Sequence, residues 1–252
     1  MPLPHPYNPA TDLLKDRVLL ITGASRGIGR SAALAYARYG ATCVLLGRQV
    51  TDLETLYDEI LAAGSPEPAI YPLDLQGASA HDYDEMAVRL EDELGRLDGV
   101  LLNAAQISTL GPVEHADPEE FARVLHINVT SSFLLLRALL PALKAQRDAA
   151  VILTTSGAGR RGRAYWGAYA ISKFATEGLM QVLADECADG PVRVNCLNPG
   201  PVRTRMRATA YPAEDPVNLA TADSIMSTYL YLMGPDSAAV RGETLDAQPP
   251  RS

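Results

Sequence analysis

The feature that most constrains this chain is a regular alternation of short apolar runs with longer segments of helical periodicity. The apolar runs cover residues 18–21, 42–46, 69–73, 100–102, 151–155, 192–197 and 243–246. The candidate helices between them cover 28–39, 52–63, 81–94, 118–145, 166–187 and 221–233. This alternation is typical of βαβ units, in which helices cover both faces of a parallel sheet. The apolar runs are continuous rather than alternating, as expected for strands that are buried on both faces.

No linker rich in Pro, Gly or Ser divides the 252 residues. We therefore expect a single α/β domain over residues 13–252, a three-layer doubly wound Rossmann fold with a seven-stranded, mostly parallel sheet. Residues 1–12 form a Pro-rich N-terminal arm in this interpretation. Residues 203–220 are a polar stretch between the last two candidate helices, and we expect them to form a substrate loop.

The charge balance excludes several classes of function. There are 22 Lys and Arg residues against 30 Asp and Glu, a net charge of −8, so we expect no nucleic-acid partner and no binding to anionic membranes. The most apolar stretch, residues 127–143, is interrupted by an arginine and a proline and is too short and polar for a membrane span. The three cysteines form no CxxC pair, which indicates a reducing compartment, the cytoplasm. The four histidines share no metal-ligand spacing, and no metal is expected.

A glycine-rich motif, TGASRGIG at residues 22–29, follows the first apolar run and opens the first candidate helix. Glycines in this position allow a tight turn and a close approach of the backbone to a pyrophosphate, and the helix N-terminus adds free N–H groups. The alternative is a glycine-rich turn without a ligand. The candidate cofactor contacts in this motif are Gly23, Ser25, Arg26, Gly27, Ile28 and Gly29.

The end of the second apolar run indicates which nucleotide would bind. NAD-binding units usually place an acidic residue there to hold the ribose 2′-OH. Here the run ends in Leu46-Gly47-Arg48, without an acid. The guanidinium of Arg48 could pair with a 2′-phosphate, and Arg26 is a second candidate. We therefore expect NADP(H) as the preferred cofactor, with NAD(H) and a merely exposed pair of arginines as the alternatives.

A tyrosine and a lysine lie one helical turn apart in the candidate helix 166–187, at Tyr169 and Lys173. An ammonium about 4 Å from the phenol would lower the tyrosine pKa by up to about 3 units and make it a usable acid–base catalyst. The alternative is a packed tyrosine beside a solvated lysine. Ser156 follows the preceding apolar run, where its hydroxyl could donate to a substrate carbonyl or serve only as a turn residue.

Together, these motifs resemble the short-chain dehydrogenase/reductase superfamily over residues 14 to 248, nearly the whole chain. Further matches are Asp74-Leu75, the turn Asn103-Ala104-Ala105, Asn128, and the segment from Pro199-Gly200 to Thr204. Within the superfamily, the segments 166–169, 173–178 and 246–249 resemble the bacterial YciK-like oxidoreductases.

The resemblance implies hydride transfer between a nicotinamide and a carbonyl or alcohol substrate. Tyr169 would exchange the proton, Lys173 would lower its pKa and hold the ribose, and Ser156 would orient the carbonyl. Asn128 would break the hydrogen-bond ladder of its helix and hold a water that relays protons to Lys173. The implied cofactor contacts outside the glycine motif are Arg48, Asp74, Leu75, Asn103, Ala104, Ala105, Tyr169, Lys173, Pro199, Gly200, Val202 and Thr204.

The resemblance also implies strand order 3-2-1-4-5-6-7 and a homotetramer or homodimer. The helices around Asn128 and Tyr169 would form one interface, and the last strand near Leu245 would form another. One departure from the family pattern falls in the turn after the fourth strand, where Ala105 or Gln106 replaces a glycine. A side chain there would crowd the adenosine ribose, with a modest expected effect on cofactor affinity.

Two arginine-rich segments follow neighbouring strands, with Arg160, Arg161 and Arg163 in one and Arg203, Arg205 and Arg207 in the other. One hypothesis is a basic pocket mouth that steers an anionic substrate. The alternative is a pair of solvated loops or a salt-bridge network between subunits.

Two other functions compete with this interpretation. A nucleotide-sensing Rossmann module without catalysis would not need Tyr169 and Lys173 together. An NAD-linked alcohol dehydrogenase would carry an acid where Arg48 stands.

Overall fold

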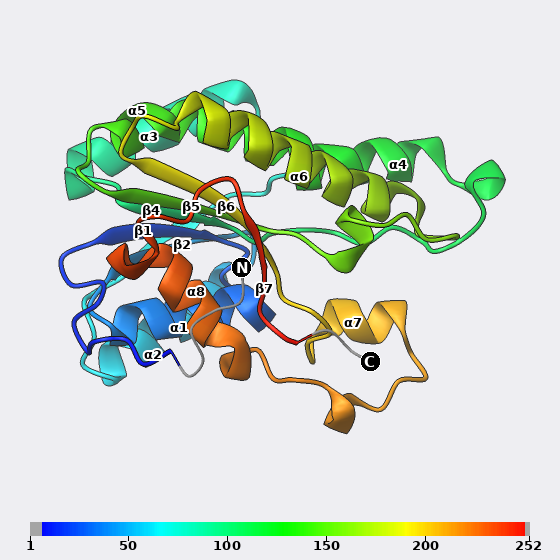
Figure 1. Ribbon diagram of the computed structural model, residues 1–252, viewed down its shortest axis with the longest axis horizontal. Coiled ribbons are helices and arrows are strands. Elements are labelled where there is room, and N and C mark those ends of the chain that lie inside the picture. The colour runs from blue at the N-terminus through cyan, green and yellow to red at the C-terminus, as the bar shows by residue number, and fades with distance from the viewer. Residues whose placement is uncertain (1–6, 250–252) are drawn as a thin grey trace.

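The computed structural model describes residues 7–249 as one seven-stranded parallel sheet between two helical layers (Figure 1). The strands are β1 (Val18–Thr22), β2 (Thr42–Gly47), β3 (Ala69–Pro72), β4 (Gly99–Leu102), β5 (Ala149–Thr154), β6 (Val192–Asn198) and β7 (Thr244–Asp246). Their order is β3-β2-β1-β4-β5-β6-β7, and every neighbouring pair is parallel. The predicted fold class and strand order are therefore confirmed.

The helices cover both faces of this sheet. They are α1 (Gly27–Arg38), α2 (Val50–Ala62), α3 (Ala80–Leu94), α4 (Pro118–Leu125), α5 (Ser131–Lys144), α6 (Gly167–Glu186), α7 (Arg205–Ala210) and α8 (Met226–Met233). Figure 1 shows α3, α5 and α6 in one layer and α1, α2 and α8 in the other.

Alternate strand residues enter two separate cores, which explains the continuous apolar runs. In β1, Leu19 and Ile21 pack toward α1 and α8, while Val18 and Leu20 pack toward α3 and α5. Because side chains alternate across a strand, both faces of a central strand need apolar residues. The two cores share one sheet, so the described residues form one domain.

The long helical stretch predicted over 118–145 is present as a continuous helical run, Pro118–Lys144, which consists of α4, a π-helical turn at His126–Thr130, and α5. By length and composition alone it could cross a membrane, contrary to the expectation from the shorter apolar stretch, and 39% of its most apolar window is buried within the fold. In the fold it lies in the layer of α3 and α6.

The segment 203–220 also differs from the expected loop, because it contains the short helix α7. Thr204 begins this helix by accepting a hydrogen bond from the Arg207 N–H through Oγ1, over 3.2 Å, as an N-cap residue does. The last long helix is shorter than predicted, since 223–225 form a 3₁₀ turn before α8.

The predicted arm, residues 1–12, lies partly outside the described residues. The part from Tyr7 onward packs on the domain. The Tyr7 hydroxyl donates to Asp236 over 2.8 Å, and its ring meets that of Tyr231 edge-on, with 5.2 Å between centroids.

A buried ionic network closes the amino edge of the sheet. The Arg193 guanidinium is fully buried and donates to Asp148, to Ser237 and to the carbonyls of Leu232 and Gly234. Arg17 pairs with the same Asp148 carboxylate. Buried charges need such partners, because removing a charge from water is costly unless it is paired and hydrogen-bonded.

Candidate active site

The predicted site residues lie at one edge of the sheet. In a parallel sheet all carboxyl ends of the strands share an edge, and ligands of open α/β folds bind there. The glycine motif follows β1, Arg48 follows β2, Asp74 follows β3 and Ser156 follows β5. The turn 103–106 follows β4, and the segment 199–204 follows β6.

The glycine motif is fixed to the turn after β4. Thr22 Oγ1 accepts hydrogen bonds from the N–H groups of Asn103 and Ala104, over 2.9 Å and 3.0 Å. Gly23 has φ +67° and lies so close to Ala104 that a Cβ would come within 3.1 Å of its Cα. A Cβ on Gly29 would lie 2.2 Å from the Gly23 carbonyl oxygen. Side chains at Gly23 and Gly29 would collide with the chain's own backbone, so this tight turn requires glycine at both positions.

Ser25, Arg26, Gly27 and Ile28 continue this loop into the first turn of α1, with Arg26 exposed at the N-cap. A Cβ on Gly27 would meet the Thr204 methyl at 3.5 Å. The segment after β6 therefore lies against the glycine loop. Val202 is buried there and forms a bridge to Ala220.

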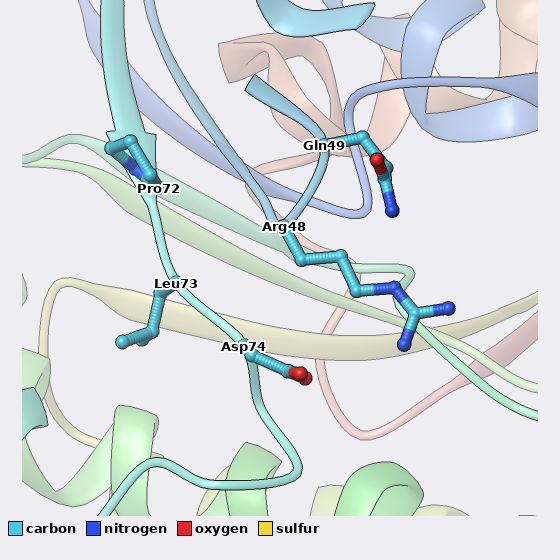
Figure 2. A pocket seen from close by; sticks show the side chains of 5 residues that line it. All are labelled: Arg48, Gln49, Pro72, Leu73 and Asp74. Carbon is cyan, nitrogen blue, oxygen red and sulfur yellow. The ribbon is translucent and has the colours of Figure 1, made fainter. Parts of the chain in front are cut away.

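A pocket of about 450 Å³ opens beside the ends of β2 and β3, lined by Arg48, Gln49, Pro72, Leu73 and Asp74. Figure 2 shows that the Arg48 guanidinium and the Asp74 carboxylate extend toward the same space. Leu75, next in the chain, is buried in the core. This arrangement places a cation where an acid would hold a ribose hydroxyl in an NAD-binding unit.

Tyr169, Ser156 and Lys173 come together between α6 and the end of β5. Tyr169 is 7% exposed and Lys173 is 4% exposed. Lys173 Nζ donates to the Thr154 carbonyl over 2.7 Å and lies 5.7 Å from the centroid of the Tyr169 ring. Ser156 Oγ accepts a hydrogen bond from the Ala158 N–H over 3.2 Å, and the Ser156 hydroxyl acts to lower the pKa of Tyr169.

The expected lowering of the Tyr169 pKa by the lysine is not observed. Burial raises the pKa of Tyr169 above its usual value, and the hydrogen bond from Ser156 lowers it. Burial also lowers the pKa of Lys173 to about 8. The predicted effect required the Lys173 ammonium to lie about 4 Å from the phenol. In the structure, Lys173 Nζ is instead turned toward the Thr154 carbonyl. At neutral pH the phenol therefore keeps its proton.

Asn128 lies within the π-helical turn and is 4% exposed. The predicted break in the helical ladder is therefore present. Its side chain donates to the Gln106 carbonyl and to Ser172 Oγ, both over 2.9 Å, and accepts from the Gln106 N–H over 2.8 Å. The side-chain amide thus holds the turn that carries Ala105 and Gln106, a contact that the sequence did not indicate.

Two further groups in the site were missed by the sequence analysis. Gln248 Nε2 donates to the carbonyls of Pro199 and Pro201, over 2.7 Å and 3.0 Å, and holds the turn at Gly200. Tyr211, at the end of α7, has its ring 5.7 Å from that of Trp166. The Asp-Ala-Gln-Pro resemblance near the C-terminus was the available signal for Gln248; nothing in the sequence pairs Tyr211 with Trp166.

The two arginine-rich segments are only partly available to a ligand. Arg160 pairs with Asp246, and Arg207 pairs with Glu214. Arg203 donates to the carbonyls of Pro216 and Val217. Arg161, Arg163 and Arg205 are exposed. Half of these arginines are therefore held by groups of the chain itself, two by carboxylates and Arg203 by backbone carbonyls.

Among residues 7–249, no group of three or more His, Cys, Asp and Glu side chains could hold a metal ion. The cysteines Cys43, Cys187 and Cys196 are buried and free.

Comparison with known proteins places these observations in a family. Residues 17–215 match the family model described as short chain dehydrogenase. The uncharacterized oxidoreductase YciK of Escherichia coli K12 is 48% identical over 97% of this chain and 97% of its own length.

Two solved structures have the same fold over almost the whole chain. A protein from Pseudomonas syringae described as a short chain dehydrogenase is 53% identical, with a TM-score of 0.94 over 96% of this chain and 98% of its own. A similarly described protein from Escherichia coli CFT073, in complex with NADPH, is 49% identical, with a TM-score of 0.93 over 96% and 100%.

Proposed function

The chain belongs to the short-chain dehydrogenase family, and we propose that it is an NADP(H)-dependent oxidoreductase that interconverts a carbonyl and an alcohol. One observation carries this proposal. Tyr169 and Lys173 are buried at the carboxyl edge of the sheet, Ser156 lies partly buried at the end of β5, and the Ser156 hydroxyl is close enough to Tyr169 to lower the pKa of its phenol. A protonated phenol that is oriented by a hydroxyl is a suitable proton donor for a reduced carbonyl oxygen.

The proposed cofactor fits the residues that are present. The glycine loop makes a tight turn at Gly23 and Gly29 that side chains would prevent, and this turn leads into the N-terminus of α1, whose N–H groups would hold a pyrophosphate. Arg48 in its pocket would pair with the 2′-phosphate, and Arg26 is a second candidate. The NADPH complex of the Escherichia coli CFT073 relative supports the same choice.

When bound, NADP(H) supplies or accepts the hydride at the substrate carbon. The residues of the chain supply the proton chemistry and the positions of the groups. Tyr169 would donate its proton to the carbonyl oxygen, and Ser156 would hold that oxygen by a hydrogen bond. The raised pKa of Tyr169 keeps the phenol protonated at neutral pH, which favours reduction.

Lys173 and Asn128 would support Tyr169. Lys173 Nζ, held by the Thr154 carbonyl, would contact the nicotinamide ribose and return a proton to Tyr169. Asn128 would hold the turn 103–106 in place and, with a bound water, pass protons to Lys173. The other proposed cofactor contacts are Asp74, Leu75, Asn103, Ala104, Ala105, Pro199, Gly200, Val202 and Thr204.

The proposal includes a homo-oligomer, a dimer or tetramer. Phe133 on α5 and Ile171, Phe174 and Val182 on α6 are apolar side chains that are 46% to 56% exposed. Exposed apolar side chains of this kind on α5 and α6 fit contact with a second copy of the chain. The unpaired edge of β7 would form the other contact. Light scattering of the Phe174→Glu variant, expected to give a smaller species, tests the helical interface.

A reducing cytoplasm suits the three buried free thiols.

The function is tested by NADPH turnover with a panel of carbonyl compounds, alongside calorimetric binding of NADPH and NADH. We expect the Tyr169→Phe variant to lose at least about 100-fold in kcat and to keep its NADPH affinity. The Tyr165→Phe variant, an exposed neighbour, serves as the matched control. NADPH binding without any turnover of carbonyls or alcohols would favour the nucleotide-sensing module instead.

A further inference from the structure

Three aromatic rings form a row that leads outward from the proposed proton donor. The Tyr169 ring lies 5.8 Å from that of Trp166, and Trp166 lies 5.7 Å from Tyr211, measured between centroids. The planes are tilted by 52° and 44°, as is favoured for aromatic pairs at this separation. We call Tyr169, Trp166 and Tyr211 the aromatic row.

The surroundings of the aromatic row are apolar. Ala158 and Ala170 pack with Tyr169 in one small buried cluster, and Ile107, Trp166 and Met206 pack against that cluster. These residues come from four separate segments of the chain. Apart from Lys173, whose Nζ lies 5.7 Å from the centroid of the Tyr169 ring, the side chains named here around Tyr169 carry no charge.

The charge nearest the outer end of the row is neutralised within the chain. The Arg207 guanidinium lies over the Tyr211 ring, 3.7 Å from its centroid, a cation–π contact. Nε and Nη2 of the same guanidinium donate to the two oxygens of the Glu214 carboxylate, over 2.6 Å and 2.8 Å. An anionic ligand would have to displace this carboxylate, so Arg207 is poorly suited to bind one.

Helix α7 places this wall next to the proposed cofactor site. Its N-cap, Thr204, lies against Gly27 of the glycine loop, and its C-cap is Tyr211. Met206 reaches from α7 to the cluster around Tyr169. A substrate whose carbonyl lies at Tyr169 and beside the nicotinamide would therefore have its body against α7 and the aromatic row.

We propose that the substrate is an uncharged carbonyl compound with a flat aromatic or conjugated body, held against Trp166 and Tyr211. This inference rests on the proposed oxidoreductase function and names the substrate class of that site. Flat rings gain stacking as well as apolar burial on such a wall, while a carboxylate against it would lose hydration and would meet Arg207 already paired with Glu214.

The first test compares three aldehydes with NADPH: benzaldehyde, cyclohexanecarbaldehyde and para-carboxybenzaldehyde. The three have different intrinsic reactivity, so the ratios of kcat/KM are compared between variants. In Trp166→Leu and in Tyr211→Leu, we expect the benzaldehyde to cyclohexanecarbaldehyde ratio to fall about three- to tenfold, mainly through KM. Tyr211→Phe keeps the ring and should keep the ratio. Tyr165→Leu removes an exposed ring beside Trp166 and is the matched control.

The second test does not depend on turnover. Trp166 is the only tryptophan in the chain, so intrinsic fluorescence reports directly on the aromatic row. We expect NADPH to quench Trp166 emission by energy transfer, and benzamide, which is not reduced, to change the emission of the NADPH complex saturably. Benzoate should bind at least about tenfold more weakly than benzamide.

Several outcomes would overturn the inference. These are a ratio unchanged in both leucine variants, a preference for para-carboxybenzaldehyde that the leucine variants leave intact, and tighter binding of benzoate than of benzamide. The last two would support the basic-mouth hypothesis. If NADPH quenches Trp166 but no carbonyl is reduced, the proposed function fails, and the benzamide titration still decides whether the row binds flat uncharged ligands.

Discussion

The side chain of Asn128 and the main chain of Gln106 exchange two hydrogen bonds, one in each direction. The second amide hydrogen of Asn128 goes to Ser172 on α6. One buried side chain therefore joins the π-helical turn, the turn after β4 and the helix that carries Tyr169. The family pattern has a glycine in that turn, and here the residues in question are Ala105 and Gln106. Their backbone position is set by Asn128 rather than left to the turn alone.

Replacing Asn128 by Leu should therefore destabilise the protein itself. The change leaves the partly buried Gln106 N–H and carbonyl without their partner, and each such loss costs about 1–3 kcal/mol. We expect the free energy of unfolding in urea to fall by about 2–4 kcal/mol. The exposed Asn218→Leu should change it by less than about 0.5 kcal/mol. Equal losses in the two variants would contradict this assignment.

The pocket at Arg48 predicts a specific loss of discrimination between the two nicotinamide nucleotides. Arg48→Gln removes the charge that would face the 2′-phosphate. We expect the NADPH dissociation constant to rise about tenfold, equivalent to about 1.4 kcal/mol, with little change for NADH. Calorimetry with both nucleotides measures this, with Arg38→Gln on α1 as the control. An equal rise in the dissociation constants of NADPH and NADH would show that Arg48 does not bind the 2′-phosphate.

The buried ammonium of Lys173 predicts a pH dependence of stability. Its folded pKa of about 8 lies below its usual value of 10.5. Between these two values the unfolded chain holds more protons than the folded one, so the lysine's contribution to stability rises with pH. Relative to Lys173→Met, the free energy of unfolding should increase by about 3 kcal/mol from pH 8 to pH 10.5.

Denaturant melts of both proteins across this window measure the difference, which removes the contributions of all other titrating groups. Below about pH 7 the two curves should run parallel, because Lys173 is then largely protonated in both the folded and the unfolded chain. Parallel curves throughout the window would mean that Lys173 titrates normally in the folded protein.

Gln248 predicts a selective effect on the nicotinamide half of the cofactor. Its amide holds the carbonyls of Pro199 and Pro201, and the turn between them passes so close that a Cβ on Gly200 would lie 2.8 Å from Nε2. Gln248→Leu removes both donors. We expect the NADPH dissociation constant to rise about three- to tenfold.

The binding of adenosine 2′,5′-bisphosphate, which lacks nicotinamide, should not change in this variant. Gln146→Leu, at the far end of α5, serves as the control because its amide bonds only to its own helix. Equal weakening of NADPH and of the bisphosphate would indicate general damage to the fold instead.

The sequence predicted most of what depends on local pattern. The seven strands and their order followed from alternating apolar runs and from the family resemblance, because burial on both faces leaves a clear signal. The glycine loop and its place between β1 and α1 were also predicted from the sequence. The structure brings these elements to one edge, as the parallel topology requires.

What the sequence did not predict depends on contacts between distant segments. The side chain of Lys173 turns to the Thr154 carbonyl, and the spacing of residues along a helix does not determine this side-chain orientation. The π-helical turn leaves no mark on the apolar periodicity of its helix, so the break at Asn128 was expected only from the family resemblance, and the contacts of its side chain were not expected at all. Helix α7 is six residues long and lies in a polar stretch, and its capping residue Thr204 was assigned only to the cofactor.

The ionic network of Arg17, Asp148 and Arg193 lies at the amino edge of the sheet, and the proposed chemistry lies at the carboxyl edge. Substitutions that are far apart and share no partners usually have additive effects. Substitutions at the amino edge should therefore change the melting temperature without changing substrate preference. Substitutions in α7 should change substrate preference, and a loss of stability that they cause can be offset by stabilising substitutions at the amino edge.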